Sequence, residues 1–254
     1  MYEKAQLAFE EYMKNYDLTN PLILLKYKHT YQVVELMSEL AFRLNLSKDD
    51  MILAKVIGLL HDIGRFEQIK KYNVISDKKT NMDHAEYGYH YLFLEHHIKD
   101  FGVLEDTLEA SIIGKSILNH NKYKIEDNLT KRELLFTKMI RDMDKVDIFR
   151  VLALKNHEVF KADEVSSDVL KEFSLNHEIN NHLIKSETDK TVSRLAFVFD
   201  INFNESFDIL VQTDNFDFYL SMVDVASDSE KLWKKLREIC FDKINRGVGE
   251  EDVR

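Results

Sequence analysis

Proline and glycine are scarce in this chain: its 254 residues include one proline and seven glycines. Both residues are typical of tight turns and of the devices that end or protect strands. Their scarcity therefore argues against a β-rich fold and favours long helices. With 44% hydrophobic residues, the chain is long enough to bury a sizeable core. We expect an all-α protein.

Cysteine is equally rare, because Cys240 is the only one and the chain cannot form an internal disulfide. Residues 1–16 have an amphipathic helical pattern with acidic residues, unlike the basic flank and apolar block of a secretion signal. The longest apolar runs, at 21–25 and 56–60, fall well below the roughly 20 residues that span a bilayer. These features favour a cytoplasmic protein without a membrane partner.

No basic block occurs, and 35 basic against 45 acidic residues give a net charge of −10. This balance argues against broad electrostatic binding to duplex nucleic acid. A small anionic substrate is still compatible with it, because a few cations or bound metal ions can reverse the sign of the field inside one pocket.

Helical patterns recur along the first part of the chain. Ser47 is an expected N-cap, Asp83 is another, and Thr130 with Glu133 forms a capping-box pattern. We expect helices at about 22–45, 47–61, 83–98, 104–119 and 130–154, and a loop at about 64–81. The helix that ends near His61 is apolar almost all round, so it is expected to be central.

The last hundred residues carry amphipathic segments and many aromatic side chains. The segments lie at about 164–185, 188–212 and 226–244. The aromatic residues, which we assign to core and lid packing, are Phe197, Phe199, Phe203, Phe207, Phe216, Phe218 and Tyr219. A surface rich in such residues is also compatible with a homodimer interface. We expect a single domain over 1–254, with a metal-binding core at about 22–155 and a C-terminal helical extension at about 156–254.

Six histidine and aspartate residues form the most informative pattern. They are His29, His61, Asp62, His84, His120 and Asp144. Imidazole and carboxylate are the usual ligands of borderline divalent metals, and six such groups can hold two ions with positions left open for water and substrate. His61 and Asp62 end the most apolar helix, where an ionisable pair is costly to bury without a charge partner or a metal. The pattern therefore predicts a metal site organised by this pair.

Helix geometry separates His84 from the histidines that follow it. Gly88 lies one turn after His84 on the same face, where its small size permits close helix approach. Three histidines expected at the surface lie about 120° or more from that face: His90, His96 and His97. The alternatives to metal binding are a satisfied core or surface position for His29, a packing role for His84, and a capping or solvent-facing role for His120.

The segment 140–147 offers three aspartates on one expected helix. Asp142 points about 160° away from Asp144, whereas Asp147 lies one turn on and only about 60° away. Spacing alone does not separate Asp144 from Asp147 as a ligand.

Four short blocks of sequence resemble the HD-domain superfamily of metal-dependent phosphohydrolases. LeuLeuHisAspIleGlyArgPhe at 59–66 is similar to the His-Asp block of that family, and IleArgAspMetAspLysValAsp at 140–147 to its closing block. AspHisAlaGluTyrGly at 83–88 and AsnHisAsn at 119–121 resemble the additional histidine motifs of members with two metals. The resemblance covers about 22–155 and implies an HD-like helical bundle.

The resemblance implies a ligand set. One ion is assigned to His29, His61, Asp62 and Asp144, and a second to His84 and His120, with Asp62 as the bridge. It favours Asp144 over Asp147, which is left as an outer-sphere or solvent-facing acid. A single ion is the alternative, with His84 and His120 binding phosphate as cations. Iron, manganese, zinc, cobalt and nickel all suit such ligands.

The implied activity is hydrolysis of a phosphomonoester or phosphodiester, with a nucleotide favoured, by a metal-activated hydroxide. Arg65, three residues after Asp62, is a candidate to hold the substrate phosphate through its planar fork, an ordinary surface arginine being the alternative. Lys145 is a weaker candidate. Two other classes of function remain: a catalytically silent HD-type sensor that binds metal and nucleotide, and a purely structural helical protein.

Specificity motifs of two known HD groups are missing from the sequence. The Gly-Tyr-Pro motif of members specific for bis-guanylate cyclic dinucleotides has no counterpart after 119–121. The Glu-Asp pair that follows the doublet in alarmone hydrolases is replaced by IleGlyArgPheGlu at 63–67. The substrate is therefore left open.

Overall fold

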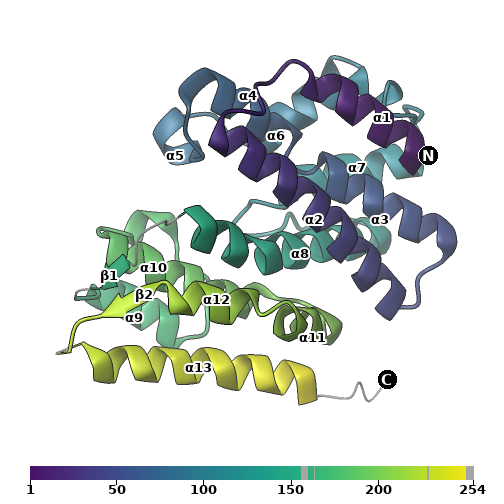
Figure 1. Ribbon diagram of the computed structural model, residues 1–254. Coiled ribbons are helices and arrows are strands. Elements are labelled where there is room, and N and C mark those ends of the chain that lie inside the picture. The colour runs from purple at the N-terminus through teal and green to yellow at the C-terminus, as the bar shows by residue number, and fades with distance from the viewer. Residues whose placement is uncertain (156–159, 163, 228, 250–254) are drawn as a thin grey trace. The chain divides into compact units, whose positions relative to one another are not determined.

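The computed structural model describes residues 1–155, 160–162, 164–227 and 229–249, and it confirms the expected all-α fold (Figure 1). The helices are α1 Tyr2–Met13, α2 Pro21–Arg43, α3 Lys48–Leu60, α4 Ile63–Tyr72, α5 Asp77–Thr80, α6 His84–Tyr89, α7 Leu108–Asn119, α8 Lys131–Lys155, α9 Ser167–Ser174, α10 Glu187–Leu195, α11 Asn204–Gln212, α12 Asn215–Ser221 and α13 Glu230–Gly249. Short helical turns lie at His90–Leu94, His97–Lys99, Asn181–Leu183 and Ala196–Asp200. Two three-residue strands, β1 Phe160–Ala162 and β2 Val223–Val225, pair in parallel with Phe160 opposite Val223.

The chain divides into two compact units, Met1–Asp144 and Lys145–Arg254. The division falls inside α8, so the same helix contributes residues to both units. The expectation of a single domain stays a prediction. Among the described helices, none has the length and hydrophobicity needed to cross a bilayer.

Helices α2 and α3 lie side by side and begin at well-formed caps (Figure 1). The Asn20 side chain accepts hydrogen bonds from the first turn of α2, and Ser47 Oγ accepts one from Asp50 N at 3.1 Å, as predicted. A Cβ on Gly58 would lie 3.1 Å from Val34 Cα, so the two backbones approach closely. This approach brings His61, at the end of α3, against α2.

The predicted loop at 64–81 is wrong, because α4 and the single turn α5 occupy most of it. Ile63, Phe66 and Ile69 recur at helical spacing and are buried. Their spacing defines a narrow apolar stripe along the helix. The segment therefore packs as a helix and does not form a loop. It was predicted as a loop because most of the residues between Ile63, Phe66 and Ile69 are polar.

Helix α6 begins where the sequence predicted, since Asp83 Oδ1 accepts from Ala85 N at 2.8 Å. It ends earlier, at Tyr89, and continues as a π-helical turn at His90–Leu94. The predicted close approach at Gly88 is confirmed, because a Cβ there would lie 3.1 Å from Ile63 Cγ2. Opposite it, a Cβ on Gly64 would overlap the carbonyl oxygen of His84.

Replacing Gly64 with alanine is expected to destabilise the protein by about 1–3 kcal/mol, because backbone atoms cannot rotate away from an added methyl as a side chain can. The nearest groups are the His84 carbonyl and Gly88 N. Urea unfolding measures the effect, with Lys71→Ala, an exposed position of the same helix, as the matched control. Equal stability of Gly64→Ala and wild type would contradict this contact between α4 and α6.

Helices α7 and α8 complete the first unit. The predicted capping box of α8 is formed: Thr130 N donates to Glu133 Oε2 at 2.8 Å, and Glu133 N donates to Thr130 Oγ1 at 3.3 Å. Arg141 in α8 is 1% exposed and donates to the carbonyl of Asn119 at 2.9 Å. That bond ties the end of α7, where His120 lies, to α8.

The second unit has an aromatic core of its own. Phe207, Phe216 and Tyr219 are buried, which confirms core packing for them, whereas Phe218 is 40% exposed. Cys240 is also buried, and burial raises the pKa of its thiol to about 12. The amphipathic segment expected at 188–212 is divided into α10 and α11 by the turn Ala196–Asp200, and the one at 164–185 consists of α9 and the turn Asn181–Leu183.

Candidate metal centre

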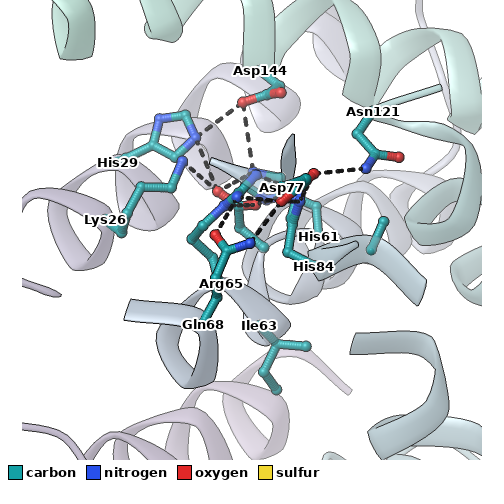
Figure 2. Close-up of polar contacts among 12 residues, drawn as sticks. Lys26, His29, His61, Ile63, Arg65, Gln68, Asp77, His84, Asn121 and Asp144 are labelled. Atoms are coloured by element: carbon teal, nitrogen blue, oxygen red, sulfur yellow. Dashed lines mark hydrogen bonds and ion pairs between the residues drawn. The ribbon is translucent and has the colours of Figure 1, made fainter. Parts of the chain in front are cut away.

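All six candidate ligands lie together in the first unit. Figure 2 labels four of them, His29, His61, His84 and Asp144. Their positions are His29 in α2, His61 after α3, Asp62 before α4, His84 at the start of α6, His120 after α7 and Asp144 in α8. We call these residues the His/Asp cluster. Residues separated by more than a hundred positions thus meet in one place.

Most of the cluster is shielded from solvent. The four histidines and Asp62 are between 0% and 3% exposed. The Asp144 side chain is 23% exposed, and that of the neighbouring Asp77 is 32% exposed. These two carboxylates are therefore the parts of the site that are most exposed to solvent.

The cluster divides into two groups of donor atoms, each within 4.8 Å of one another. The first group is His29, His61 and Asp144, and the second group is Asp62, His84 and His120. In the first group, His29 Nε2 lies 3.0 Å from Asp144 Oδ1. In the second, His84 Nε2 lies 3.0 Å from His120 Nε2.

Asp62 faces both groups. Its Oδ2 lies 3.7 Å from His29 Nε2 and 3.7 Å from His61 Nε2. Its Oδ1 lies 3.0 Å from His84 Nε2 and 3.8 Å from His120 Nε2. One carboxylate oxygen is thus directed at each group, which is the arrangement a bridging ligand requires.

Backbone carbonyls fix the tautomers of two rings. His61 Nδ1 lies 2.8 Å from the carbonyl of Gly58, and His120 Nδ1 lies 2.7 Å from that of Ile117. A carbonyl can only accept, so each Nδ1 carries the hydrogen. In the neutral ring, Nε2 then presents a lone pair to the cluster, as a metal ligand must.

These lone pairs fit a cation. In the second group, the Nε2 atoms of His84 and His120 meet an oxygen of Asp62. In the first, His61 Nε2 is buried without a hydrogen-bond partner among the described residues. Converging acceptors in a buried site are unfavourable unless a cation lies between them. The residues present therefore suit a divalent metal in each group.

Asp62 and Asp144 have lowered pKa values. Burial by itself raises the pKa of Asp62, but the ammonium of Lys26 and the nearby imidazoles outweigh it and hold the pKa well below its usual range. Burial also raises the pKa of Asp144, but the imidazole of His29, 3.0 Å from Asp144 Oδ1, and the nearby ring of His61 outweigh it and hold the pKa well below its usual range. Both groups are carboxylates at neutral pH, the form that binds metal.

Arg65 lies at the cluster and is only 9% exposed, so the interpretation as a surface arginine is wrong. Its Nη1 lies 2.7 Å from Asp77 Oδ1 and its Nη2 lies 2.9 Å from His84 Nε2. Its Nε lies 3.7 Å from Asp62 Oδ1. The guanidinium is thus placed beside the second group.

The other charged candidates lie outside the cluster. Lys145 forms ion pairs with Asp200 at 2.6 Å and Glu178 at 3.3 Å in the second unit. The solvent-facing alternative for Asp147 is wrong, because Asp147 is fully buried and pairs with Arg150 at 2.6 Å. The surface positions predicted for three histidines are confirmed by the exposure of His90, His96 and His97.

Sequence reasoning missed two residues that contact the cluster. Lys26 is 3% exposed and forms an ion pair with Asp62 Oδ2. It lies one turn before His29, so its place on the same face of the helix was a usable indication. Asp77 contacts His84 Nδ1 at 2.8 Å, but it lies in the segment expected to be a loop.

An all-helical unit that gathers four histidines and two aspartates into one buried cluster has the features of a candidate divalent-metal protein. The family model of the HD domain matches residues 27–149, and this part of the chain belongs to the HD-domain superfamily. HD domains are generally metal-binding hydrolases, and the matched range contains the whole cluster. Comparison with curated proteins and with solved structures gave no match.

Proposed function

We propose that this protein is a metal-dependent phosphohydrolase that cleaves a phosphomonoester or phosphodiester, with a nucleotide as the favoured substrate. The observation that supports it best is the placement of Asp62, whose two oxygens face two separate groups of histidines. A site that serves only structure needs about four closed ligands, whereas this cluster offers six around one shared carboxylate.

The first group and Asp62 Oδ2 would hold one ion, and the second group with Asp62 Oδ1 would hold the other. Iron, manganese, zinc, cobalt and nickel are all compatible with these ligands. When bound, the ions supply Lewis acidity, which lowers the pKa of water to near 7 and offsets charge on phosphoryl oxygens. Two divalent ions with Asp62 and Asp144 leave a charge of about +2, which attracts phosphate.

The protein residues orient the substrate and exclude water. Burial of the histidines keeps bulk water from the reacting groups, and the phosphate is proposed to enter beside Asp144, the most exposed of the six ligands. Arg65 is the proposed phosphate ligand. Arg65 Nη2 lies 2.9 Å from His84 Nε2. If a metal ion took the lone pair of that nitrogen, Nη2 would become available to donate to a phosphoryl oxygen.

The remaining partners are also part of the proposal. The substrate is a small phosphorylated molecule, and neither duplex nucleic acid nor a membrane is a partner. A cytoplasmic location is proposed from the single, buried cysteine, and a homodimer from the aromatic side chains that the second unit leaves exposed, Phe218 and Phe241. The alternative is a catalytically silent HD-type sensor, which uses the same ligands to bind metal and nucleotide without turnover.

Wild-type protein purified without chelator is expected to contain one or two divalent ions per chain and to hydrolyse p-nitrophenyl phosphate or bis(p-nitrophenyl) phosphate. Chelation should abolish turnover and added Mn²⁺ should restore it, because the metal ions are needed to activate the attacking water. Elemental analysis and release of p-nitrophenol measure both. Metal-free wild-type protein would contradict the proposal. Bound metal without turnover on phosphoester and nucleotide panels would favour the sensor.

A further inference from the structure

His84 is contacted on both of its ring nitrogens. Its Nδ1 lies 2.8 Å from Asp77 Oδ2, and its Nε2 lies 2.9 Å from Arg65 Nη2. A guanidinium can only donate, so this contact places a lone pair on His84 Nε2; Asp62 Oδ1, 3.0 Å from the same nitrogen, is a second acceptor directed at the proposed metal position. The ring hydrogen is then on Nδ1, where the carboxylate of Asp77 accepts it. Both contacts thus assign the same tautomer, the one that can ligate a metal through Nε2.

The position of His84 in its helix explains why a carboxylate is needed. His61 and His120 follow helices α3 and α7, so the carbonyl three residues earlier belongs to the preceding turn and accepts from Nδ1. His84 is the first residue of α6, and the residue three positions before it lies outside that helix. A group from elsewhere must take the same role, and Asp77 of α5 supplies it.

Asp77 is itself held in place from α4. Its Oδ1 accepts from Arg65 Nη1 at 2.7 Å and from Gln68 Nε2 at 2.8 Å. Gln68 is fully buried, and its Nε2 also lies 2.9 Å from Thr80 Oγ1 and 2.9 Å from the carbonyl of Met82. Burial raises the pKa of Asp77, but His84 and Arg65 outweigh it and lower the pKa, so the group stays a carboxylate.

We propose that Asp77 is a positioning residue, which fixes His84 in the Nδ1–H tautomer so that Nε2 can hold the metal of the second group. This inference rests on the proposed function. Arg65 and Gln68 take part by holding Asp77 Oδ1, which leaves Oδ2 for His84. Carboxylates that orient a metal-binding histidine typically contribute a factor of 10–100 to metal affinity.

Asp77→Asn is the sharpest test. Because Arg65 and Gln68 both donate to the Oδ1 position, the asparagine is expected to keep its oxygen there and turn its NH₂ toward His84. An NH₂ group donates to Nδ1, so the ring hydrogen moves to Nε2, where Asp62 Oδ1 at 3.0 Å accepts it, as in a serine-protease triad whose aspartate becomes asparagine. The Nε2 lone pair is then lost, which weakens binding of the metal of the second group.

Two measurements on the whole chain detect this change of tautomer and its effect on metal binding. Nitrogen-15 NMR of the histidine rings in metal-free protein reports the tautomer of His84, expected to be Nδ1–H in wild type and Nε2–H in Asp77→Asn. Calorimetric titration with Mn²⁺ is expected to show one equivalent bound about 10–100-fold more weakly and the other unchanged. Asp77→Glu, which keeps a carboxylate, should recover part of the loss.

The matched control is Asp100→Asn, because Asp100 Oδ2 lies 3.1 Å from His97 Nδ1 on the surface, outside the cluster. It should leave Mn²⁺ binding unchanged.

An Asp77→Asn protein that binds both equivalents like wild type, or keeps His84 as Nδ1–H, would overturn the inference alone. Wild type that binds no Mn²⁺ would overturn the proposed function, and the NMR comparison would still decide the role of Asp77. If Asp77→Asn does not fold, an Nε2–H tautomer in wild type overturns the inference.

Discussion

Replacing Asp62 with alanine is expected to remove both metal ions and to reduce phosphoester turnover by roughly 10³-fold or more, about 4 kcal/mol of transition-state stabilisation. Asp62 supplies an oxygen to each group of histidines, at 3.0 Å from His84 Nε2 and 3.7 Å from His61 Nε2. One substitution therefore weakens metal binding by both groups, whereas replacing one histidine weakens metal binding by one group only. Elemental analysis and steady-state kinetics measure the two effects.

Asp147→Ala is the matched control for loss of a buried aspartate. Asp147 is fully buried and paired with Arg150, so its removal is expected to lower stability while metal content and turnover per folded chain are retained. A chain with Asp62→Ala that keeps its full metal content would rule out the bridging role. Loss of metal in Asp147→Ala with retention in Asp144→Ala would transfer the ligand role to Asp147.

The adjacent pair His61 and Asp62 can serve one cluster because the chain changes direction between them. On a continuous helix, neighbouring side chains point about 100° apart and rarely meet the same ligand. Here Asp62 lies between α3 and α4, with φ −108° and ψ 16°, while His61 keeps helical angles. The break turns Asp62 toward the middle of the cluster, where it separates the two groups.

Much of this arrangement was predictable from the sequence because it depends on local rules. Ser47, Asp83 and the Thr130–Glu133 box each satisfy backbone groups that a helix start leaves open, so the helix starts followed from short motifs. The spacing of the histidines and aspartates was visible as residue types that are costly to bury alone. Those indications needed no knowledge of contacts between distant segments.

The residues that support the ligands were not predictable in the same way. Gln68 and Asp77 lie in a polar segment, and polarity alone favours a loop. The two side chains are held by a hydrogen bond between α4 and α5, which Gln68 Nε2 donates to Asp77 Oδ1 at 2.8 Å. Such a bond depends on tertiary packing, which no local pattern encodes. Lys26 differs from Gln68 and Asp77, because its place one turn before His29 was a usable local indication, although its partner Asp62 is distant in the sequence.

Replacing Lys26 with methionine is expected to destabilise the metal-free protein by about 3–5 kcal/mol. The side chain is 3% exposed and forms an ion pair with Asp62 Oδ2, so its loss leaves a buried carboxylate without its cation. Methionine keeps most of the volume, which limits any cavity effect. Urea unfolding in the presence of a chelator measures the difference in the free energy of unfolding.

Metal should reverse this loss, because Lys26 and an ion bound by the first group compete for the same oxygen, Asp62 Oδ2. Added Mn²⁺ is therefore expected to stabilise Lys26→Met more than wild type, and to bind the variant more tightly. Lys28→Met, which replaces an exposed lysine of the same helix, should match wild type with and without Mn²⁺. If chelated Lys26→Met is as stable as wild type, or if Mn²⁺ stabilises both equally, the ammonium of Lys26 does not compensate Asp62 in the metal-free protein.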